Sequence, residues 1–429
     1  MARLPRPGHL LLLALPLAAP AAAQPEPTPI AGGKYVLAWS DNVSVPVQPG
    51  FAQFVPEASD RLVITSFQGA PLVGKNAIYM YNAHGCSGNC LEELPGSRKI
   101  NWPNVVTGLD EAVFGFRAMT VGSGFLVPTH ATGGVHVFEA SAPPSHLPKP
   151  VKITGDKRGW FYHLAVPRDM DGDGLVDLVT SRCQFGMLPG SQKRGELVWL
   201  RHPASDALSG QPWEEHRLAD GPDFLFCEQP GSKTLAVAAP EFINERIMYY
   251  YMKDGEMRNR TLDAASGPGF SCSWADLDGD GRLELLATNH KNKGGALYAY
   301  SFDSDDFATA SVQRHVLALG FNAVSEEKGT ASPGDAVVFS PGTGGGKPYI
   351  FVSGDNGDNI FVLVPRSQDA GDFSYTLQKI ADLGSDIGRP AIGDTDGDGF
   401  ADIYVPAYDQ RVVVHYEFGL AQGAGTVLV

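Results

Sequence analysis

Charged residues are scarce in this chain of 429 residues: they make up 19% of it, against 43% hydrophobic residues. Basic residues are the scarcer sign, with 33 Lys and Arg against 48 Asp and Glu, and the formal net charge is −15. This balance argues against nucleic acid as a partner, because phosphate binding needs a clustered basic surface. The hydrophobic share is large enough for a substantial core, which excludes a disordered chain. The 50 Gly and 32 Pro favour many short strands over long helices.

Long apolar runs are missing after the N-terminus. Arg3 and Arg6 precede the run Leu10–Leu15, and the small residues Ala21–Ala23 follow it. A basic segment, a short apolar segment and an Ala-x-Ala exit are typical of a secretory signal peptide. The apolar stretch is too short for a membrane anchor. We therefore expect a signal peptide at residues 1–23 and a secreted mature chain, residues 24–429, without a membrane span.

Cysteine is also rare, with five residues and no CxxC pair, so a cysteine-held zinc site is not expected. Cys86 and Cys90 lie in the short loop CSGNC, where a local disulfide is plausible in an oxidising compartment. Cys183, Cys227 and Cys272 leave at least one thiol unpaired, and the sequence does not decide which. Sequons for N-linked glycosylation occur at Asn42 and Asn259.

An aspartate-rich motif occurs three times, as DMDGDGLVD from Asp169, DLDGDGRLE from Asp276 and DTDGDGFAD from Asp394. Ca²⁺ binds about six to eight oxygen ligands, and a tight loop with acids at positions one, three, five and nine and a carbonyl at position seven can supply them. The glycines at positions four and six permit the backbone angles of such a loop. The sequence therefore predicts three Ca²⁺ sites, with these ligands: Asp169, Asp171, Asp173, Leu175 and Asp177; Asp276, Asp278, Asp280, Arg282 and Glu284; Asp394, Asp396, Asp398, Phe400 and Asp402.

The motifs are not EF-hands, because position twelve is Thr180, Ala287 or Val405 and strand-like sequence follows. They begin at residues 169, 276 and 394, so the intervals are 107 and 118 residues. Each interval is about twice the length of a four-stranded propeller blade, which predicts degenerate repeats between the motifs. The loops could act as calcium sensors or bridge calcium to a ligand, or they could be structural clips, in which bound calcium only stabilises the turn. We expect the structural role.

Degenerate repeats are visible. A strand rich in aromatic and β-branched residues recurs seven times, at residues 76–83, 133–140, 195–202, 245–252, 295–302, 358–365 and 411–418. A candidate outer strand follows all but the last, at residues 97–102, 150–155, 213–218, 256–262, 311–319 and 375–383. The spare strand KYVLAWS lies at the other end, at residues 34–40. These strands predict one all-β domain, a seven-bladed β-propeller closed by its N-terminal strand.

Strand, DxDxDGxxD loop and strand at blade spacing resemble the FG-GAP/VCBS repeat, the module of integrin α-subunit propellers and of many secreted microbial proteins. The segment GELVWLRHPASDALSGQPWEEHRLADG, residues 195–221, is similar to the secreted branch, which includes the propellers of aldos-2-ulose dehydratase-type enzymes and of some lectins. The resemblance covers essentially the whole mature chain and implies structural calcium. Four repeats lack the acids, as at residues 116–124 and 227–234. The family is functionally mixed, so it implies the fold more firmly than an activity.

The topology of such a ring predicts a working face opposite the calcium loops, where the second strand of each blade ends. The residues at this position are Gln68, His130, Arg182, Glu241, His290, Asp355 and Asp409. The starts of the first strands add Trp160, Tyr162, His163 and Arg389. Turn residues are often polar for solvation alone. Mixed Arg, His, carboxylate and aromatic groups also suit a pocket for a sugar or an acidic glycan.

Two functions stay open. The first is a secreted, monomeric, calcium-binding module that recognises an extracellular carbohydrate or protein. The alternative is a sugar-active dehydratase or lyase, as the aldos-2-ulose dehydratase resemblance implies. Its base would be His130, His163 or His290, and Arg182 or Arg389 would stabilise the anion that forms. No hydrolase template such as HExxH or a nucleophile elbow is visible.

Overall fold

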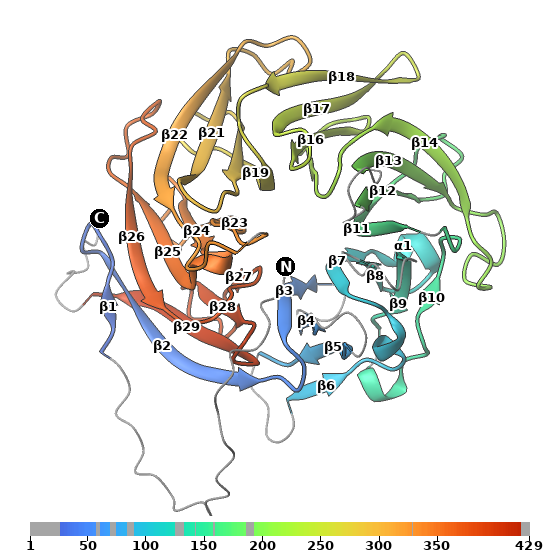
Figure 1. The fold of residues 1–429 in the computed structure, drawn as a ribbon, viewed down its shortest axis with the longest axis horizontal. Coiled ribbons are helices and arrows are strands. Elements are labelled where there is room, and N and C mark those ends of the chain that lie inside the picture. Colours follow the sequence, from blue (N-terminus) through green and yellow to red (C-terminus); the bar gives the residue numbers. More distant parts are fainter. Residues whose placement is uncertain are drawn as a thin grey trace, which may run out of the picture.

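The structure is a computed structural model, and it describes residues 26–421 apart from 57–60, 69–73, 84–89, 125–132, 142, 158, 186–192 and 328. Seven antiparallel sheets stand around a common centre and form a closed β-propeller (Figure 1). The predicted fold class is therefore confirmed. The expected signal peptide, His130 and Cys86 lie outside the described residues.

The first three blades follow the chain from the innermost to the outermost strand. Blade 1 contains β3 (Pro49–Val55), β4 (Arg61–Phe67), β5 (Asn76–Tyr81) and β6 (Leu91–Glu93). Blade 2 contains β7 (Pro103–Leu109), β8 (Ala118–Ser123), β9 (Gly134–Glu139) and β10 (Val151–Lys152). Blade 3 contains β11 (Trp160–Arg168), β12 (Asp177–Phe185), β13 (Lys193–Arg201) and β14 (Glu214–Asp220). Helical segments are short: α1 (Glu111–Phe114), η2 (Ser97–Lys99), η3 (Pro144–His146) and η4 (Asp355–Gly357).

The next three blades repeat this order. Blade 4 contains β15 (Cys227–Glu228), β16 (Ala236–Glu241), β17 (Arg246–Lys253) and β18 (Glu256–Asp263). Blade 5 contains β19 (Gly269–Ala275), β20 (Glu284–Asn289), β21 (Gly295–Phe302) and β22 (Val312–Phe321). Blade 6 contains β23 (Ala336–Phe339), β24 (Tyr349–Ser353), β25 (Asn359–Pro365) and β26 (Tyr375–Asp382).

Blade 7 joins the two ends of the chain. Its inner strands β27 (Ala391–Gly393), β28 (Asp402–Ala407) and β29 (Val412–Leu420) come from the C-terminal end. Its outer strand β2 (Tyr35–Ser44) and the short β1 (Thr28–Pro29) come from the N-terminal end. Strand β2 pairs with β29 from Tyr35 opposite Leu420 to Ser44 opposite Val412. The predicted closure by the N-terminal strand is thus confirmed.

Several second strands of the blades are buried along their whole length. All six described residues of β8, β16, β20 and β28 are buried, because each strand is central in its sheet and is covered on both faces by the neighbouring blades. In the sequence such strands are continuous apolar runs, because neither face requires polar residues at alternate positions. The aromatic strands that follow are the third strands β5, β9, β13, β17, β21, β25 and β29, as predicted.

One predicted outer strand is wrong. Residues 97–102 form the 3₁₀ segment η2 and a turn, and the outer strand of blade 1 is β6, which precedes them. The reason is local: Gly96 adopts a positive φ of 78° and turns the chain. Ile100 then becomes buried in the core cluster shared by blades 1 and 2, with Val55 and Val106. The outer strand of blade 2 is also shorter than predicted, since β10 contains two residues.

Candidate functional site

The three aspartate-rich motifs form the loops between first and second strands, in blades 3, 5 and 7. In each loop the acids at positions one, three and nine place one carboxylate oxygen apiece within 4.8 Å of one another. These groups are Asp169, Asp171 and Asp177; Asp276, Asp278 and Glu284; Asp394, Asp396 and Asp402. The sequence spacing therefore becomes three compact clusters of oxygen donors, the ligand type that Ca²⁺ prefers.

The loops share one backbone arrangement, shown here for the first. Asp169 accepts hydrogen bonds from the amides of Gly172 (2.8 Å) and Gly174 (3.2 Å). Asp177 accepts from the amide of Met170 at 2.9 Å, which ties the ninth position back to the start of the loop. The second and third loops repeat all three bonds at equivalent positions. The carboxylates are thus oriented by the turn itself.

The acids at position five accept from the amide of position seven in every loop, at 2.8 Å: Asp173 from Leu175, Asp280 from Arg282 and Asp398 from Phe400. The burial and crowding of acids in the second loop raise the pKa of Glu284 to about 8, burial being the larger cause and Asp278 the largest of the neighbouring charges. Carboxylates held this close repel one another, and a cation between them would remove that repulsion.

The three loops differ in their neighbours. In the first loop Arg201 donates to Asp171 at 2.7 Å and lies 3.5 Å from Asp173. In the third loop the ring of His415 lies 3.3 Å from Asp402, and Asp402, His415 and Glu417 form a further group of possible metal ligands. The first loop is therefore partly neutralised by an arginine, whereas the third has an additional nitrogen donor beside it.

The opposite side of the ring is the mouth, defined here as the ends of the second strands and the starts of the first strands. The predicted residues lie there, each at or just beyond the end of a second strand: Gln68, Glu241, His290, Asp355 and Asp409. Arg182 lies within β12, and His130 lies outside the described residues. The topology therefore brings these positions to one side of the ring, although their side chains have different environments.

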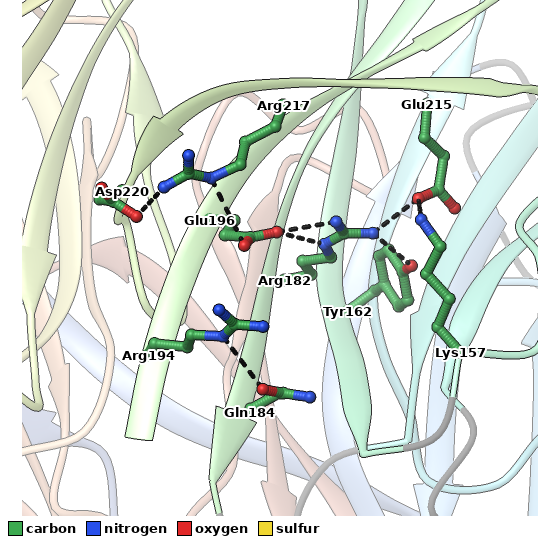
Figure 2. Close-up of polar contacts among 9 residues, drawn as sticks. All are labelled: Lys157, Tyr162, Arg182, Gln184, Arg194, Glu196, Glu215, Arg217 and Asp220. Atoms are coloured by element: carbon green, nitrogen blue, oxygen red, sulfur yellow. Dashed lines mark hydrogen bonds and ion pairs between the residues drawn. The ribbon is translucent and has the colours of Figure 1, made fainter. Parts of the chain in front are cut away.

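Arg182 is engaged in a buried ion-pair network (Figure 2). It donates to Glu196 at 2.7 and 2.9 Å and to Glu215 at 2.6 Å, and its side chain is 9% exposed. Tyr162 lies beside it at 3.5 Å, and burial raises the pKa of this tyrosine to about 12. Two carboxylates thus compensate the charge of Arg182, which leaves this arginine poorly suited to stabilise an anionic intermediate.

Glu241 is likewise used inside its blade. Its carboxylate is fully buried and accepts from Tyr250 (2.5 Å), Arg246 (2.7 Å) and Asn244 (3.0 Å). Asp409 accepts from the amide of Asp386 at 3.0 Å and is exposed. Glu241 therefore stabilises its own blade, whereas Asp409 is accessible to solvent.

The two described candidate bases are buried histidines. Burial lowers the pKa of His163 to about 3 and that of His290 to about 4. His290 Nδ1 lies 2.7 Å from the carbonyl oxygen of Pro333, so Nδ1 donates, and Nε2 lies 3.5 Å from Asp355. The rings of His163 and His290 are separated by Phe224 and Phe242. The structure therefore does not bring the two histidines together.

Most of the aromatic rings at the mouth were not identified from the sequence, which predicted only Trp160, Tyr162 and the histidines there. One arc runs over blades 3 to 5, where successive ring centroids lie 4.5–6.1 Å apart: His163, Phe224, Phe242, His290 and Phe270. A second arc joins blades 7, 1 and 2 through Tyr408, Phe67, Phe51 and Trp102. Five of these rings are partly exposed: Phe51, Trp102, Phe224, Phe242 and Phe270. The five lie in turns or near strand starts, so no regular spacing in the sequence identifies them.

A cavity of about 360 Å³ lies at the centre of the ring, lined mainly by the innermost strands. Among the described residues that line it, Arg389 alone is charged; its side chain is 32% exposed and lies 3.9 Å from buried Asp335. Gln53 and Ser271 add polar atoms. The disulfide Cys227–Cys272 also lines the cavity and joins the innermost strands of blades 4 and 5. Cys183 is free and buried, and burial raises the pKa of its thiol.

Comparisons with known proteins describe the fold only. No protein-family model and no curated protein matches the sequence. Similar solved structures include a luciferin-regenerating enzyme, at 14% identity over 76% of this chain and 94% of that chain with a TM-score of 0.41. The Dos1 propeller is 12% identical over 90% of this chain and 89% of that chain, with a TM-score of 0.48. A Mycobacterium tuberculosis puromycin-hydrolyzing peptidase is 13% identical over 87% of this chain and 56% of that chain, with a TM-score of 0.45.

These similarities are too distant to indicate an activity, and the fold assignment comes from the sheets of the chain itself. The resemblance to FG-GAP/VCBS repeats stays a prediction. Among the described residues, no helix combines the length and hydrophobicity needed to cross a bilayer.

Proposed function

We propose that this chain is a secreted, calcium-stabilised propeller of the FG-GAP/VCBS type that recognises an extracellular carbohydrate at its mouth. The observation that carries the proposal is the set of partly exposed aromatic rings around the mouth, Phe51, Trp102, Phe224, Phe242 and Phe270. Aromatic faces contact the apolar faces of sugar rings, while nearby polar groups contact hydroxyls. This mixture of aromatic rings and polar groups is the reason for choosing a carbohydrate as the ligand.

The calcium part of the proposal is supported by the donor sets of the three loops. Each loop provides three converging carboxylates, and each turn orients them through the same amide hydrogen bonds. The residues that would hold the ions are those predicted from the spacing, with the carbonyls of Leu175, Arg282 and Phe400 completing the shells. Bound Ca²⁺ would fix the connection between the first and second strands, and it has no chemical step to perform.

The lyase alternative is less well supported. Its base and its anion-stabilising group would have to lie close together. Arg182 is compensated by Glu196 and Glu215. Burial lowers the pKa of His163 to about 3 and that of His290 to about 4, which makes both histidines weak bases at neutral pH. Recognition requires no such convergence, so it is the function that we favour.

A glycan array with the purified full chain tests recognition, together with an ultraviolet assay for unsaturated sugar products. We expect binding without turnover, and we expect Trp102→Ala and Phe242→Ala to weaken it. Phe373→Ala is the matched control, because this partly buried ring stacks on His315 at 3.7 Å, away from the mouth. Binding that ignores both mouth substitutions would contradict a mouth site. New absorbance that disappears in His290→Ala would favour the lyase, and protein-only binding would replace the carbohydrate.

A further inference from the structure

One face of blade 3 carries two rows of side chains close to the mouth. Strand pairing aligns Trp160, Gln184 and Arg194 across β11, β12 and β13. The next row on the same face contains Tyr162, Arg182 and Glu196. Because alternate residues of a strand point to the same face, the two rows are in contact. This face of blade 3 is therefore an ordered array of aromatic and charged groups (Figure 2).

The charges of this array are paired except for one. Arg182 is bonded to Glu196 and Glu215, and Lys157 is bonded to Glu215. Arg217 lies 3.4 Å from Glu196 and is also bonded to Asp220. Arg194, by contrast, donates through Nε to the neutral Gln184 at 3.0 Å. No carboxylate of the described residues lies within ion-pair distance of Arg194, so its positive charge is the surplus charge of the array.

The guanidinium of Arg194 is nevertheless held in place. Gln184 accepts its Nε–H, and its Cζ lies 4.9 Å from the centroid of the Trp160 ring. The same ring is contacted by Arg182, whose Cζ is 4.5 Å from the centroid and which is fixed by two carboxylates. Arg194 itself is exposed. Its two terminal nitrogens are not joined to any other residue drawn in Figure 2. A guanidinium that is oriented by two contacts and keeps its terminal nitrogens available is suited to bind an oxyanion through two parallel hydrogen bonds.

We propose that Arg194 binds an oxyanion on a sugar, so that the mouth recognises an acidic glycan. The oxyanion is either a carboxylate or a sulfate ester. This inference rests on the proposed carbohydrate recognition and names its ligand class. The chain as a whole carries a net charge of −15 and repels polyanions, so an acidic glycan can bind only where a local cation compensates. Arg194 supplies that cation beside the aromatic mouth.

Affinity gel electrophoresis of the full chain tests this inference with three polymers: polygalacturonate for carboxylate, dextran sulfate for sulfate ester and dextran as the neutral counterpart. We expect one or both charged polymers to retard the protein, with a retardation that falls as NaCl rises. Arg194→Gln should weaken this binding by about tenfold or more, because it removes a charge-assisted bidentate contact. Gln184→Ala should weaken it less, since Trp160 still positions the guanidinium.

Arg366→Gln is the matched control, because Arg366 is also exposed and also donates through Nε to a neutral acceptor, Thr376 at 3.1 Å, but follows a third strand on the calcium-loop side. It should bind as the unchanged protein does, and equal thermal midpoints should show that all variants are folded. Charged-polymer binding that survives Arg194→Gln, or equal binding of dextran, overturns the inference. If neutral glycans bind and depend on Phe242, the proposed function holds and only this inference falls. If no glycan of any kind binds, both fall.

Discussion

Arg182 shows how a residue at a plausible site can serve the fold instead. Its guanidinium lies between Glu196 and Glu215, and all three side chains are less than a tenth exposed. We predict that Arg182→Leu lowers the free energy of unfolding by about 3 kcal/mol, because it leaves buried carboxylates without their main partner. Urea denaturation measures this loss. The exposed pair Arg258–Glu256 is the control, and Arg258→Leu should cost about 0.5 kcal/mol or less. Equal effects of the two substitutions would contradict the assignment.

His163 leads to a prediction about pH. Burial lowers its pKa in the folded state to about 3, below the ordinary value of 6.5. Between these values the unfolded chain binds a proton that the folded chain does not, so stability falls as pH falls from about 6.5. We predict that this residue alone contributes a loss of roughly 3 kcal/mol between pH 6.5 and 4.

The control for this prediction is His163→Phe, which keeps a ring beside Phe161 and Phe224. The free energy of unfolding of this variant should depend less steeply on pH over that interval. Titration of the carboxylates contributes to both proteins and cancels in the comparison. Parallel pH profiles of the two proteins would show that His163 is not the neutral, buried group described above.

At the scale of elements, the aspartate-rich loops connect the first and second strands of three blades, and the pairing of these strands is shortest in blade 7. The first strand of blade 7 is short, since β27 contains three residues, and the loop from Asp394 connects it to β28. We predict that chelation of Ca²⁺ lowers the thermal unfolding midpoint by several degrees. When the free Ca²⁺ concentration is 100 times the dissociation constant of a site, binding at that site contributes about 2.7 kcal/mol to the stability of the folded state.

Differential scanning calorimetry with Ca²⁺, Mg²⁺ or a chelator measures this effect. Asp278→Asn should reduce the calcium-dependent increase in the midpoint, because Asp278 belongs to the cluster of the second loop. Asp305→Asn, at an exposed acid outside the loops, should leave the increase unchanged. If the midpoint is the same with calcium and with chelator, the loops are not structural calcium clips.

The elements also differ in how far the sequence reveals them. The third strands recur at intervals of about one blade and the aspartate-rich loops at intervals of about two, so both could be located without a structure. The strand proposed at residues 97–102 failed because the positive φ of Gly96 turns the chain before it. Phe224, Phe242 and Phe270 could not be found, because they lie in turns and at strand starts of variable spacing. The pairing of Cys227 with Cys272 depends on the contact of two innermost strands, which only the closed ring specifies.

At the scale of the whole molecule, the acidic balance is unevenly distributed. Twelve of the 48 acids belong to the three aspartate-rich loops on one side of the ring. Bound Ca²⁺ would offset part of the net charge of −15 at those positions. The opposite side has charges of both signs: the acids Asp355 and Asp409 at the mouth, Arg194 beside it, and Arg389 in the central cavity. The aspartate-rich loops thus concentrate negative charge on one side of the ring, whereas the other side mixes the two signs.

The ring as a whole depends on the strand that closes it. Strand β2 covers β29, and Tyr35, Leu37 and Val43 on it are at most 7% exposed. We predict that a chain beginning at Val45 loses roughly 5 kcal/mol, since three large side chains leave the core, and this is comparable to the total stability of many domains. A chain beginning at Lys34 loses the two-residue β1 and one buried side chain, Ile30, and should fold.

Circular dichroism and thermal unfolding of the two truncated chains, both without residues 1–33, measure the difference. A synthetic peptide of residues 34–44 added to the shorter chain should restore the cooperative transition, because it can pair with the free edge of β29 as β2 does. A peptide with Leu37→Asp should not restore it, since Leu37 is 1% exposed in the core of blade 7. A shorter chain that unfolds at the same temperature as the longer one would show that the ring does not need this strand to close.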